Sequence, residues 1–359
     1  MPRNYSVACG APQALTAKPA ASARHQAVQS CSPRAVASVI YSTAQPTVDI
    51  ADKAVPLYLQ DPRDGSGFER LEGDRIYFAG GNSYAVHQGV PVLIDERDSV
   101  FSVRDIISDR PTTQDADYRS RGQLKNYVRQ RLLPALTCDG LSHERYMRLA
   151  RLVSGARVLV LGAGDKGDYY RRCFADAKVV TSDVHLQFGA DVVLDAHRIP
   201  FRDTTFALVL AAQVLEHTAR PWLAAAEMQR VTKAGGYIQV EVPFAFPFHG
   251  APYDFYRFTP TALRFLFAHA EVLSLEATEG PWSGAAVATT QALVDSFSNR
   301  YLRMAGVAAG RLSLWWMKYL DRFSRNSFNM PKGFAATYRK EWRARTDREM
   351  LDEVRVYEG

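Results

Sequence analysis

From residue 157 onward the chain alternates short apolar runs with amphipathic stretches. The apolar runs predict strands at 157–161, 178–182, 191–194, 206–211 and 237–242, and two late edge strands at 271–277 and 334–340. Alternating strands and helices are typical of a parallel sheet with crossover helices. The pattern therefore predicts an α/β fold with a doubly wound, Rossmann-like sheet, in which residues 281–327 form a helical insertion before the last strand.

The first 150 residues have a different pattern. Short β segments between Gly-rich turns, at 55–59, 75–78, 83–86 and 90–94, predict a small β module over 49–100. Residues 101–150 are expected to form a linker and two helices, at 123–136 and 142–153. The main domain then covers 151–345 and a C-terminal tail covers 346–359.

Residues 1–48 are rich in Ala, Ser, Gln and Pro and show no hydrophobic periodicity. Such a composition predicts a disordered tail, because too little apolar surface is available to offset the entropy of ordering. The segment holds four cations and no acid, so an organellar transit peptide is the alternative. No apolar core of a secretion signal is present.

Length and charge narrow the function classes. The 359 residues are 47% hydrophobic, and no uncharged apolar run of about 18 residues occurs, so no spanning helix is expected. The net charge of +6 gathers at the two ends, and no nucleic-acid recognition motif accompanies it, so nucleic acid is not an expected partner. The four cysteines form no CxxC pair, which favours a reducing, cytoplasmic setting.

A glycine-rich turn, Gly162-Ala163-Gly164-Asp165-Lys166-Gly167, follows the first strand of the main domain. Glycines let the backbone turn sharply and approach a ligand, and the helix that follows offers unpaired N–H groups. Asp183 ends the next strand, nineteen positions beyond Gly164, where a carboxylate can accept both hydroxyls of a ribose. These residues suit NAD and S-adenosylmethionine equally, and a purely structural turn is a third interpretation.

The next segments separate the two cofactors. They are Asp191–Phe201, Thr205–Leu210, Gln213–His217 and Glu227–Gly236, in that order. Together they resemble the class I S-adenosylmethionine-dependent methyltransferases, in particular the small-molecule subgroup, over about residues 150–280.

That resemblance implies a seven-stranded sheet and S-adenosylmethionine as cofactor. Its implied contacts are Gly162, Ala163 and Gly164 for the methionine, Asp183 with Val184 for the ribose, Asp195 with Ala196 for the adenine, and Gln213 beneath the sulfonium. Two positions depart from the family pattern: Val160 replaces an acid, and Ala207 replaces the Asp that usually follows Phe206. A nicotinamide-dependent oxidoreductase and a catalytically inactive relative are the alternatives.

An aromatic loop, residues 243–260, is expected at the carboxyl end of the fifth strand, where ligands bind in open α/β sheets. Its His-Gly-x-Pro-x-Asp-x-x-Arg-Phe-Thr pattern is similar to methyltransferases of surface-polysaccharide and glycolipid biosynthesis. The acceptor is then a small molecule, sugar or lipid-linked glycan. The candidate catalytic residues are His249, Tyr253, Asp254, Arg257 and, on the fourth strand's end, His217.

A structural role for this loop is the alternative, in which the four residues form a hydrogen-bonded cluster. His249 is the first candidate for a base, because imidazole titrates near neutral pH. Methyl transfer requires no metal, and we assign no metal ligands.

Two peripheral segments carry further expectations. Residues 84–93 resemble the last hairpin of the zinc-ribbon domain that activates or precedes many methyltransferases, but the four cysteine positions hold Asp61, Asp64, Tyr77 and Gly80, so no zinc site is expected. Residues 311–325 combine aromatic and basic side chains in one expected helix, which suits an anionic membrane surface. A helix packed over the substrate cleft is the alternative.

Overall fold

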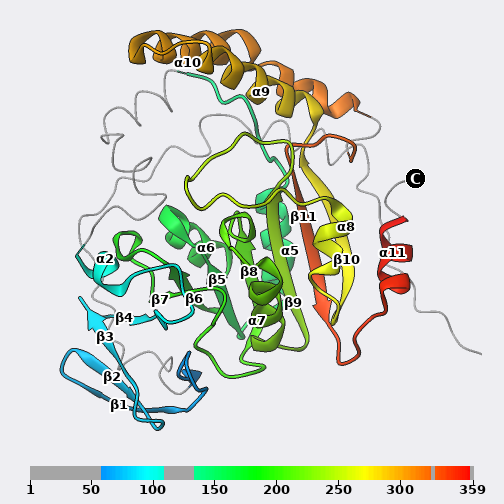
Figure 1. Ribbon diagram of the computed structural model, residues 1–359. Helices are drawn as coiled ribbons and strands as arrows, with labels where there is room; N and C mark the ends of the chain where they lie inside the picture. The colour runs from blue at the N-terminus through cyan, green and yellow to red at the C-terminus, as the bar shows by residue number, and fades with distance from the viewer. Residues whose placement is uncertain (1–57, 109–132, 325–327, 356–359) are drawn as a thin grey trace, which may run out of the picture.

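The computed structural model describes residues 58–108, 133–324 and 328–355. The tail expected at 1–48 and most of the helix expected at 123–136 lie outside these residues. Within them the sheet has eleven strands, in the order β1-β2-β3-β4-β7-β6-β5-β8-β9-β11-β10 (Figure 1). The strands are β1 Phe68–Glu72, β2 Arg75–Phe78, β3 Ser83–His87, β4 Val90–Leu93, β5 Arg157–Leu161, β6 Lys178–Asp183, β7 Val192–Leu194, β8 Phe206–Ala212, β9 Thr232–Pro243, β10 Ala270–Glu279 and β11 Gly333–Lys340.

Strands β4 to β9 that neighbour one another in the sheet are parallel, whereas β11 runs antiparallel to both β9 and β10. The sheet is therefore mixed. The expectation that 334–340 lies at an edge is wrong, because β11 inserts between β9 and β10 and leaves only β10 outermost on that side.

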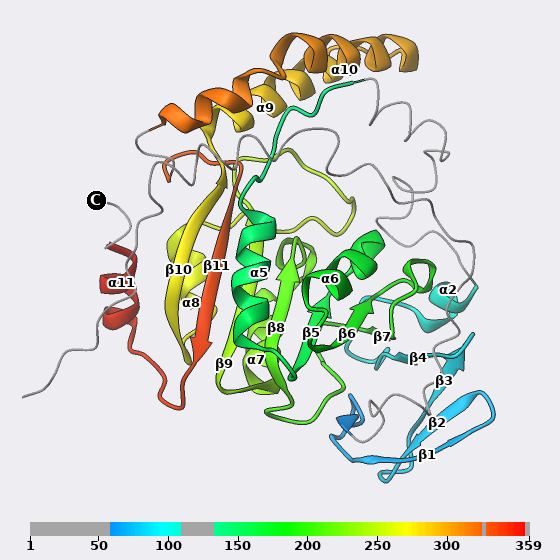
Figure 2. The ribbon, with the colours of Figure 1, turned by 180° about the vertical axis from the view of Figure 1, so that it is seen from behind.

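Alternate side chains of the central strands point to opposite faces, as the pleat requires. Val158 and Leu208 pack with the helices α5 (Ser142–Leu152) and α6 (Gly167–Cys173), whereas Leu159 and Val209 pack with α7 (Pro221–Val231). Figure 2 shows α5 in front of the sheet and α7 behind it. Helices thus cover both faces, which explains why these strands are nearly continuous apolar runs.

The N-terminal β module extends the main sheet. Strand β4 pairs in parallel with β7, with Val92 opposite Val193. This pairing explains why the described part of the chain has more strands than the seven expected. Strand β1, FERLE, was not expected as a strand, because its mostly exposed charged residues hide the apolar alternation.

Two of the positions where the sequence resemblance expects cysteines, Asp61 and Asp64, accept hydrogen bonds from residues next to β3 or within it. Asp61 is buried and accepts the Tyr84 hydroxyl at 2.6 Å. Asp64 accepts the Asn82 amide at 3.0 Å, and a Cβ added at Gly80 would lie 2.1 Å from its Oδ2. Polar side chains thus fill the space around Asp61, Asp64 and Gly80.

The insertion is a helical pair, α9 (Pro281–Asp295) and α10 (Arg300–Leu314), followed by a 3-10 helix at Met317–Phe323. The pair lies above the carboxyl ends of the parallel strands (Figures 1 and 2). The single helix expected at 311–325 is therefore wrong: α10 ends at Leu314. Asp321 instead accepts the backbone N–H groups of Gly280 and Trp282, which fixes the 3-10 helix to the start of α9.

Three shorter helices complete the fold: α2 (Val103–Ile107), α8 (Pro260–Phe265) and α11 (Asp347–Arg355). Helix α8 begins as its sequence indicates, with the Thr259 hydroxyl accepting the Ala262 N–H. Helix α11 occupies a segment expected as a tail and is bound to α8 by an ion pair between Arg264 and Glu353 at 2.6 Å. None of the described helices is long and apolar enough to cross a bilayer.

Candidate functional site

The glycine-rich turn lies at the carboxyl end of β5. Gly162 and Gly164 have φ values of +61° and +51°, a region that disfavours other residues. A Cβ at Gly162 would lie 2.5 Å from Cγ2 of Val214, so the backbone is close to the segment after β8. Ala163 is buried, and its N–H donates to the Ser182 carbonyl at 2.9 Å. The turn is thus fixed on both sides and presents backbone to the strand ends.

Asp183 closes the next strand beside this turn. Its Oδ2 accepts the Gly164 N–H at 2.9 Å and its Oδ1 accepts the His185 N–H at 3.0 Å. Burial raises the pKa of the carboxyl, while His185 and the backbone donors act in the opposite direction. Each oxygen retains a second lone pair, so the carboxylate can still accept two hydroxyls, and the half-buried Val184 lies next to it.

Asp195 is engaged more fully than expected. Its Oδ2 accepts the Ser99 hydroxyl at 2.5 Å, and its Oδ1 accepts both the backbone N–H and Nδ1–H of His197. His197 carries its proton on Nδ1, because its Nε2 accepts the Arg220 N–H at 3.2 Å. Hydrogen bonds of the protein thus already use both oxygens of the carboxylate, with the buried Ala196 beside it.

The segment after β4 lies against the main domain here, a contact that sequence reasoning missed. Asp98 pairs with Arg220 at 2.9 Å and with Arg198 at 3.2 Å. Phe101 contacts the ring of Tyr253, with centroids 5.7 Å apart. Residues 98–101 therefore connect the β module, Asp195 and the aromatic loop. The run of charged residues after β4 indicates that this segment forms ion pairs, but the sequence does not indicate which residues are its partners.

Gln213 follows β8 with a left-handed backbone, φ +59°. Its side chain is exposed, while its N–H donates to the Glu241 carbonyl at 2.8 Å. A strained non-glycine residue at the end of a central strand is typical of a functional position. Val160, where the resemblance expects an acid, is fully buried between β8 and the helices α5 and α6, so it presents nothing to a ligand.

The aromatic loop joins three of the four residues of the alternative structural cluster, His249, Asp254 and Arg257, by hydrogen bonds. The buried carboxylate of Asp254 receives Nη1 and Nη2 of Arg257 at 2.5 and 2.7 Å and the His249 N–H at 2.7 Å. Arg257 also donates to the carbonyls of Phe246 and Pro247. These contacts fix the loop. The interpretation of Asp254 and Arg257 as a structural cluster is therefore well supported by the geometry.

His217 and His249 lie next to each other, with ring centroids 5.0 Å apart. Nδ1 of His217 lies 2.6 Å from the carbonyl of Tyr253, so that nitrogen donates. Burial lowers the pKa of both imidazoles, which are therefore neutral near pH 7. Glu216, which sequence reasoning passed over, is completely buried beside them, and burial raises its pKa to about 8.

A second buried cluster was also missed. Arg145 of α5 pairs with Asp139, with Glu241 at 3.3 Å and with Glu276 at 3.6 Å, and is 2% exposed. Glu241 and Glu276 come from β9 and β10, so the cluster joins α5 to the far half of the sheet. The only sequence signal was an Arg at an amphipathic position.

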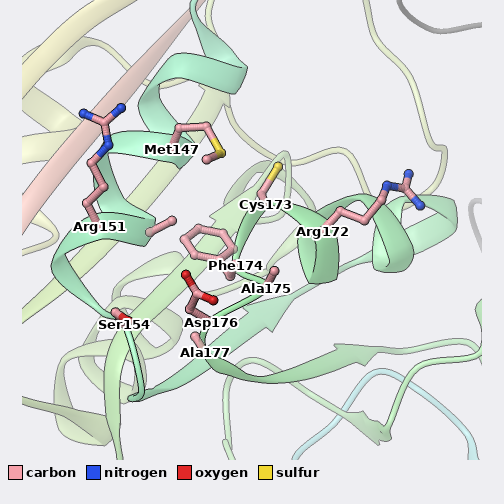
Figure 3. Close-up of a pocket in the computed structure, with 10 residues that line it drawn as sticks. Met147, Arg151, Ser154, Arg172, Cys173, Phe174, Ala175, Asp176 and Ala177 are labelled. Carbon is pink, nitrogen blue, oxygen red and sulfur yellow. The ribbon is translucent and has the colours of Figure 1, made fainter.

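A pocket also lies on the other side of the molecule. Figure 3 shows it between the end of α5 and the end of α6, lined by residues that include Met147, Arg151, Cys173 and Phe174. These segments precede β5 and β6, so the pocket is at the amino ends of the strands. None of the expected site residues lines it.

Residues 168–240 match the family model described as a methyltransferase domain. The match begins after the glycine-rich turn and covers Asp183, Asp195, Gln213 and His217. The central part of the chain is thus a methyltransferase-like α/β domain.

Individual proteins match over a short segment or with low sequence identity. An uncharacterized methyltransferase of Mycobacterium avium is 34% identical over 97 residues, which cover 23% of this chain and 38% of that protein. The match thus spans less than half the length of that curated relative. Two solved structures resemble this chain with TM-scores below 0.5. The first is the [4+2]-cyclase SpnF, with a TM-score of 0.37 and 22% identity over 56% of this chain and 80% of that chain. The second is Haemonchus contortus phosphoethanolamine N-methyltransferase 2 with S-adenosylhomocysteine, with a TM-score of 0.40 and 12% identity over 64% of this chain and 60% of that chain.

Proposed function

We propose that this protein is an S-adenosylmethionine-dependent methyltransferase whose acceptor is a small molecule, a sugar or a lipid-linked glycan. The observation that carries the proposal is the hydrogen bond from Gly164 to Asp183 at the carboxyl ends of β5 and β6. It joins a left-handed glycine turn to a buried carboxylate next to the segment that matches a methyltransferase domain.

The residues present fit the cofactor in two of three places. At Gly164 no atom lies within 4 Å of where a Cβ would be, which leaves space for the methionine part, whereas Val214 fills that space at Gly162. Asp183 has lone pairs for both ribose hydroxyls. The adenine is held differently from the family pattern in our proposal, through the wall formed by Ser99, Asp195 and Ala196 rather than by an unpaired carboxylate.

When bound, the cofactor supplies a methyl group on a positively charged sulfur. The chain contributes position, and aligning two reactants corresponds to effective molarities of about 10⁵ M or more. Gln213 and the loop 243–260 line the side on which the acceptor binds. The neutral imidazole of His249 can take a proton from an acceptor hydroxyl or carboxyl, with Tyr253 and His217 beside it.

The proposal also covers the β module, the helical insertion and the N-terminal segment. The β module is proposed to be a zinc-ribbon relative in which hydrogen bonds around Asp61 and Asp64 replace the metal. Peripheral membrane contact through 311–325, at the cytoplasmic face, suits a lipid-linked acceptor. Import into an organelle by residues 1–48 is the competing proposal for location.

A cofactor-binding protein without turnover is the second candidate, because Val160 and Ala207 depart from the family and Asp195 is already engaged. Calorimetry of the full chain with S-adenosylhomocysteine, S-adenosylmethionine and NAD⁺ tests whether the protein binds the cofactor of a methyltransferase, that of an oxidoreductase, or neither. Binding of the two sulfur nucleosides alone supports the proposal. Binding of NAD⁺ alone favours an oxidoreductase, and binding of none contradicts every function built on Asp183.

Methyl transfer itself is then measured with radiolabelled S-adenosylmethionine and a panel of sugar and glycolipid acceptors. Turnover separates an enzyme from an inactive binding protein.

A further inference from the structure

Three potential metal ligands converge beneath the aromatic loop. Glu216, His217 and His249 each place one carboxylate or imidazole atom so that all three atoms lie within 4.8 Å of one another. Two of the residues follow β8 and the third comes from the loop after β9, so the group forms only when the loop is folded onto the sheet.

The carboxyl group of Glu216 accepts no hydrogen bond from the described part of the chain. Its side chain is completely buried, and neither carboxylate oxygen has a hydrogen bond there. Its main-chain carbonyl, by contrast, accepts the N–H groups of Phe255 and Tyr256, so the residue is firmly positioned. Burying an unpartnered carboxylate is costly, and such a group in a native fold indicates an ion or a ligand at that point.

His217 is oriented as a metal ligand. Its Nδ1–H donates to the Tyr253 carbonyl at 2.6 Å, which leaves the lone pair on Nε2. That nitrogen lies 3.8 Å from Oε1 of Glu216, too far for a hydrogen bond but close enough for both atoms to bind one ion. A backbone carbonyl that fixes the opposite ring nitrogen is the common support of ligating histidines.

His249 completes the group. Its Nδ1 lies 3.2 Å from the Pro247 carbonyl, and donation there leaves the lone pair of Nε2 for a ligand. Arg257 is also 3.3 Å from Nδ1, but its donors are already used by Asp254 and by main-chain carbonyls.

We propose that Glu216, His217 and His249 bind a divalent transition-metal ion. Two imidazoles and one carboxylate suit Zn²⁺ or Fe²⁺ better than Mg²⁺ or Ca²⁺, which prefer oxygen ligands throughout. Three protein ligands leave coordination positions open, as in catalytic rather than structural zinc sites.

The role of the ion rests on the proposed function. An acceptor hydroxyl or carboxyl at an open position would be held beside the loop, and coordination would lower the pKa of the hydroxyl. The proton of the coordinated hydroxyl would then pass to solvent water, so that His249 would not be needed as the base. Metal binding itself needs no assumption about methyl transfer.

The test uses the full chain, treated with a chelator and dialysed. Calorimetry with Zn²⁺ is expected to show one site, and Co²⁺ is expected to give a visible absorption band of a nitrogen-ligated ion. Glu216→Gln, His217→Gln and His249→Gln should each weaken Zn²⁺ binding at least ~10-fold. His269→Gln is the matched control, since His269 is exposed and its hydrogen bonds involve only its backbone.

Thermal unfolding of each variant checks that the fold is kept. Equal Zn²⁺ affinity in the wild type and in Glu216→Gln and His249→Gln would overturn the proposal, as would Mg²⁺ competing equally with Zn²⁺ or an absence of Zn²⁺ and Co²⁺ binding. S-adenosylhomocysteine binding is measured on the same samples. If S-adenosylhomocysteine binds and Zn²⁺ does not, the metal site is ruled out and the proposed function stands. If Zn²⁺ binds and S-adenosylhomocysteine does not, the metal site stands and the proposed function is ruled out.

Discussion

Gly164 donates its backbone N–H to Oδ2 of Asp183 over 2.9 Å, although nineteen residues separate the two. The bond crosses from the end of one parallel strand to the end of its neighbour. It fixes the glycine turn relative to the carboxylate before any ligand arrives. Preorganisation of this kind reduces the entropy lost on binding.

The first prediction concerns the space at Gly162. Gly162→Ala adds a left-handed alanine and a contact at 2.5 Å with Val214, so we expect about 2–4 kcal/mol of lost stability and at least ~10-fold weaker S-adenosylhomocysteine binding. Denaturant unfolding and calorimetry measure the two effects.

Gly155→Ala is the matched control for that variant. Gly155 also has a left-handed backbone, φ +72°, but no atom lies within 4 Å of its added Cβ. It should lose only ~1–2 kcal/mol of stability and bind the nucleoside normally. Adding Val214→Ala to Gly162→Ala should restore part of the loss, and no restoration would show that the contact with Val214 is not the cause.

The second prediction concerns the charge at Asp183. Asp183→Asn retains one acceptor oxygen but turns an amide toward either Gly164 or His185. We expect a loss of about 1.5–3 kcal/mol in nucleoside binding, which is ~10- to 150-fold in Kd. Asp165→Asn, an exposed acid of the same turn, should bind normally. Equal Kd values for the two variants would remove the ribose role from Asp183.

The main sheet was predictable because its strands carry a local signal. Strand β5 has the expected bounds, since four consecutive apolar residues follow Arg157 and end at a glycine. Strand β1 was missed because four of its five residues are exposed and three of them are charged, so burial does not shape its sequence. The break after Leu314 was missed because it depends on Asp321 binding the start of α9, a contact between segments about forty residues apart.

In the candidate site, too, contacts between residues near in sequence could be predicted and contacts between distant residues could not. His249, Asp254 and Arg257 could be grouped from sequence because nine consecutive residues of one loop contain all three. Ser99 with Asp195 and Arg145 with Glu241 could not, because 96 residues separate the partners in each pair. Glu216 was missed for another reason. Its buried carboxylate accepts no hydrogen bond from the described residues, and residue spacing in the sequence cannot show this.

The third prediction concerns acid stability around Asp95. Hydrogen bonds from Arg97, and a further one from Arg63, hold the pKa of the buried Asp95 carboxyl at about 2, below the usual 3.8. A lowered pKa contributes stability that is fully present above pH 4 and is lost as pH falls through about 2.

Wild type should therefore lose ~1–2 kcal/mol more than Asp95→Asn between pH 5 and pH 2, allowing for the exposure of both arginines. Urea unfolding across that range provides the measurement. Asp74→Asn, an exposed acid in the turn between β1 and β2, should follow the wild-type curve. Parallel curves for wild type and Asp95→Asn would contradict the linkage.

The last prediction concerns the surface of the insertion. Leu312, Trp316 and Phe323 are 58%, 49% and 65% exposed, near the basic Lys318 and Arg322. Burying an apolar side chain in an interface contributes up to ~1.5–3 kcal/mol, and each nearby cation adds ~1 kcal/mol on an anionic surface. Wild type should therefore float with phosphatidylserine vesicles at low salt, float less at high salt, and not float with phosphatidylcholine alone.

A variant carrying Leu312→Ser, Trp316→Ser and Phe323→Ser should lose flotation, whereas Trp342→Ser, which removes an 82% exposed indole outside the insertion, should keep it. If the triple variant floats like wild type, or if wild type never floats, the segment does not bind membranes, and a raised KM for acceptor in the triple variant would then indicate packing over the cleft.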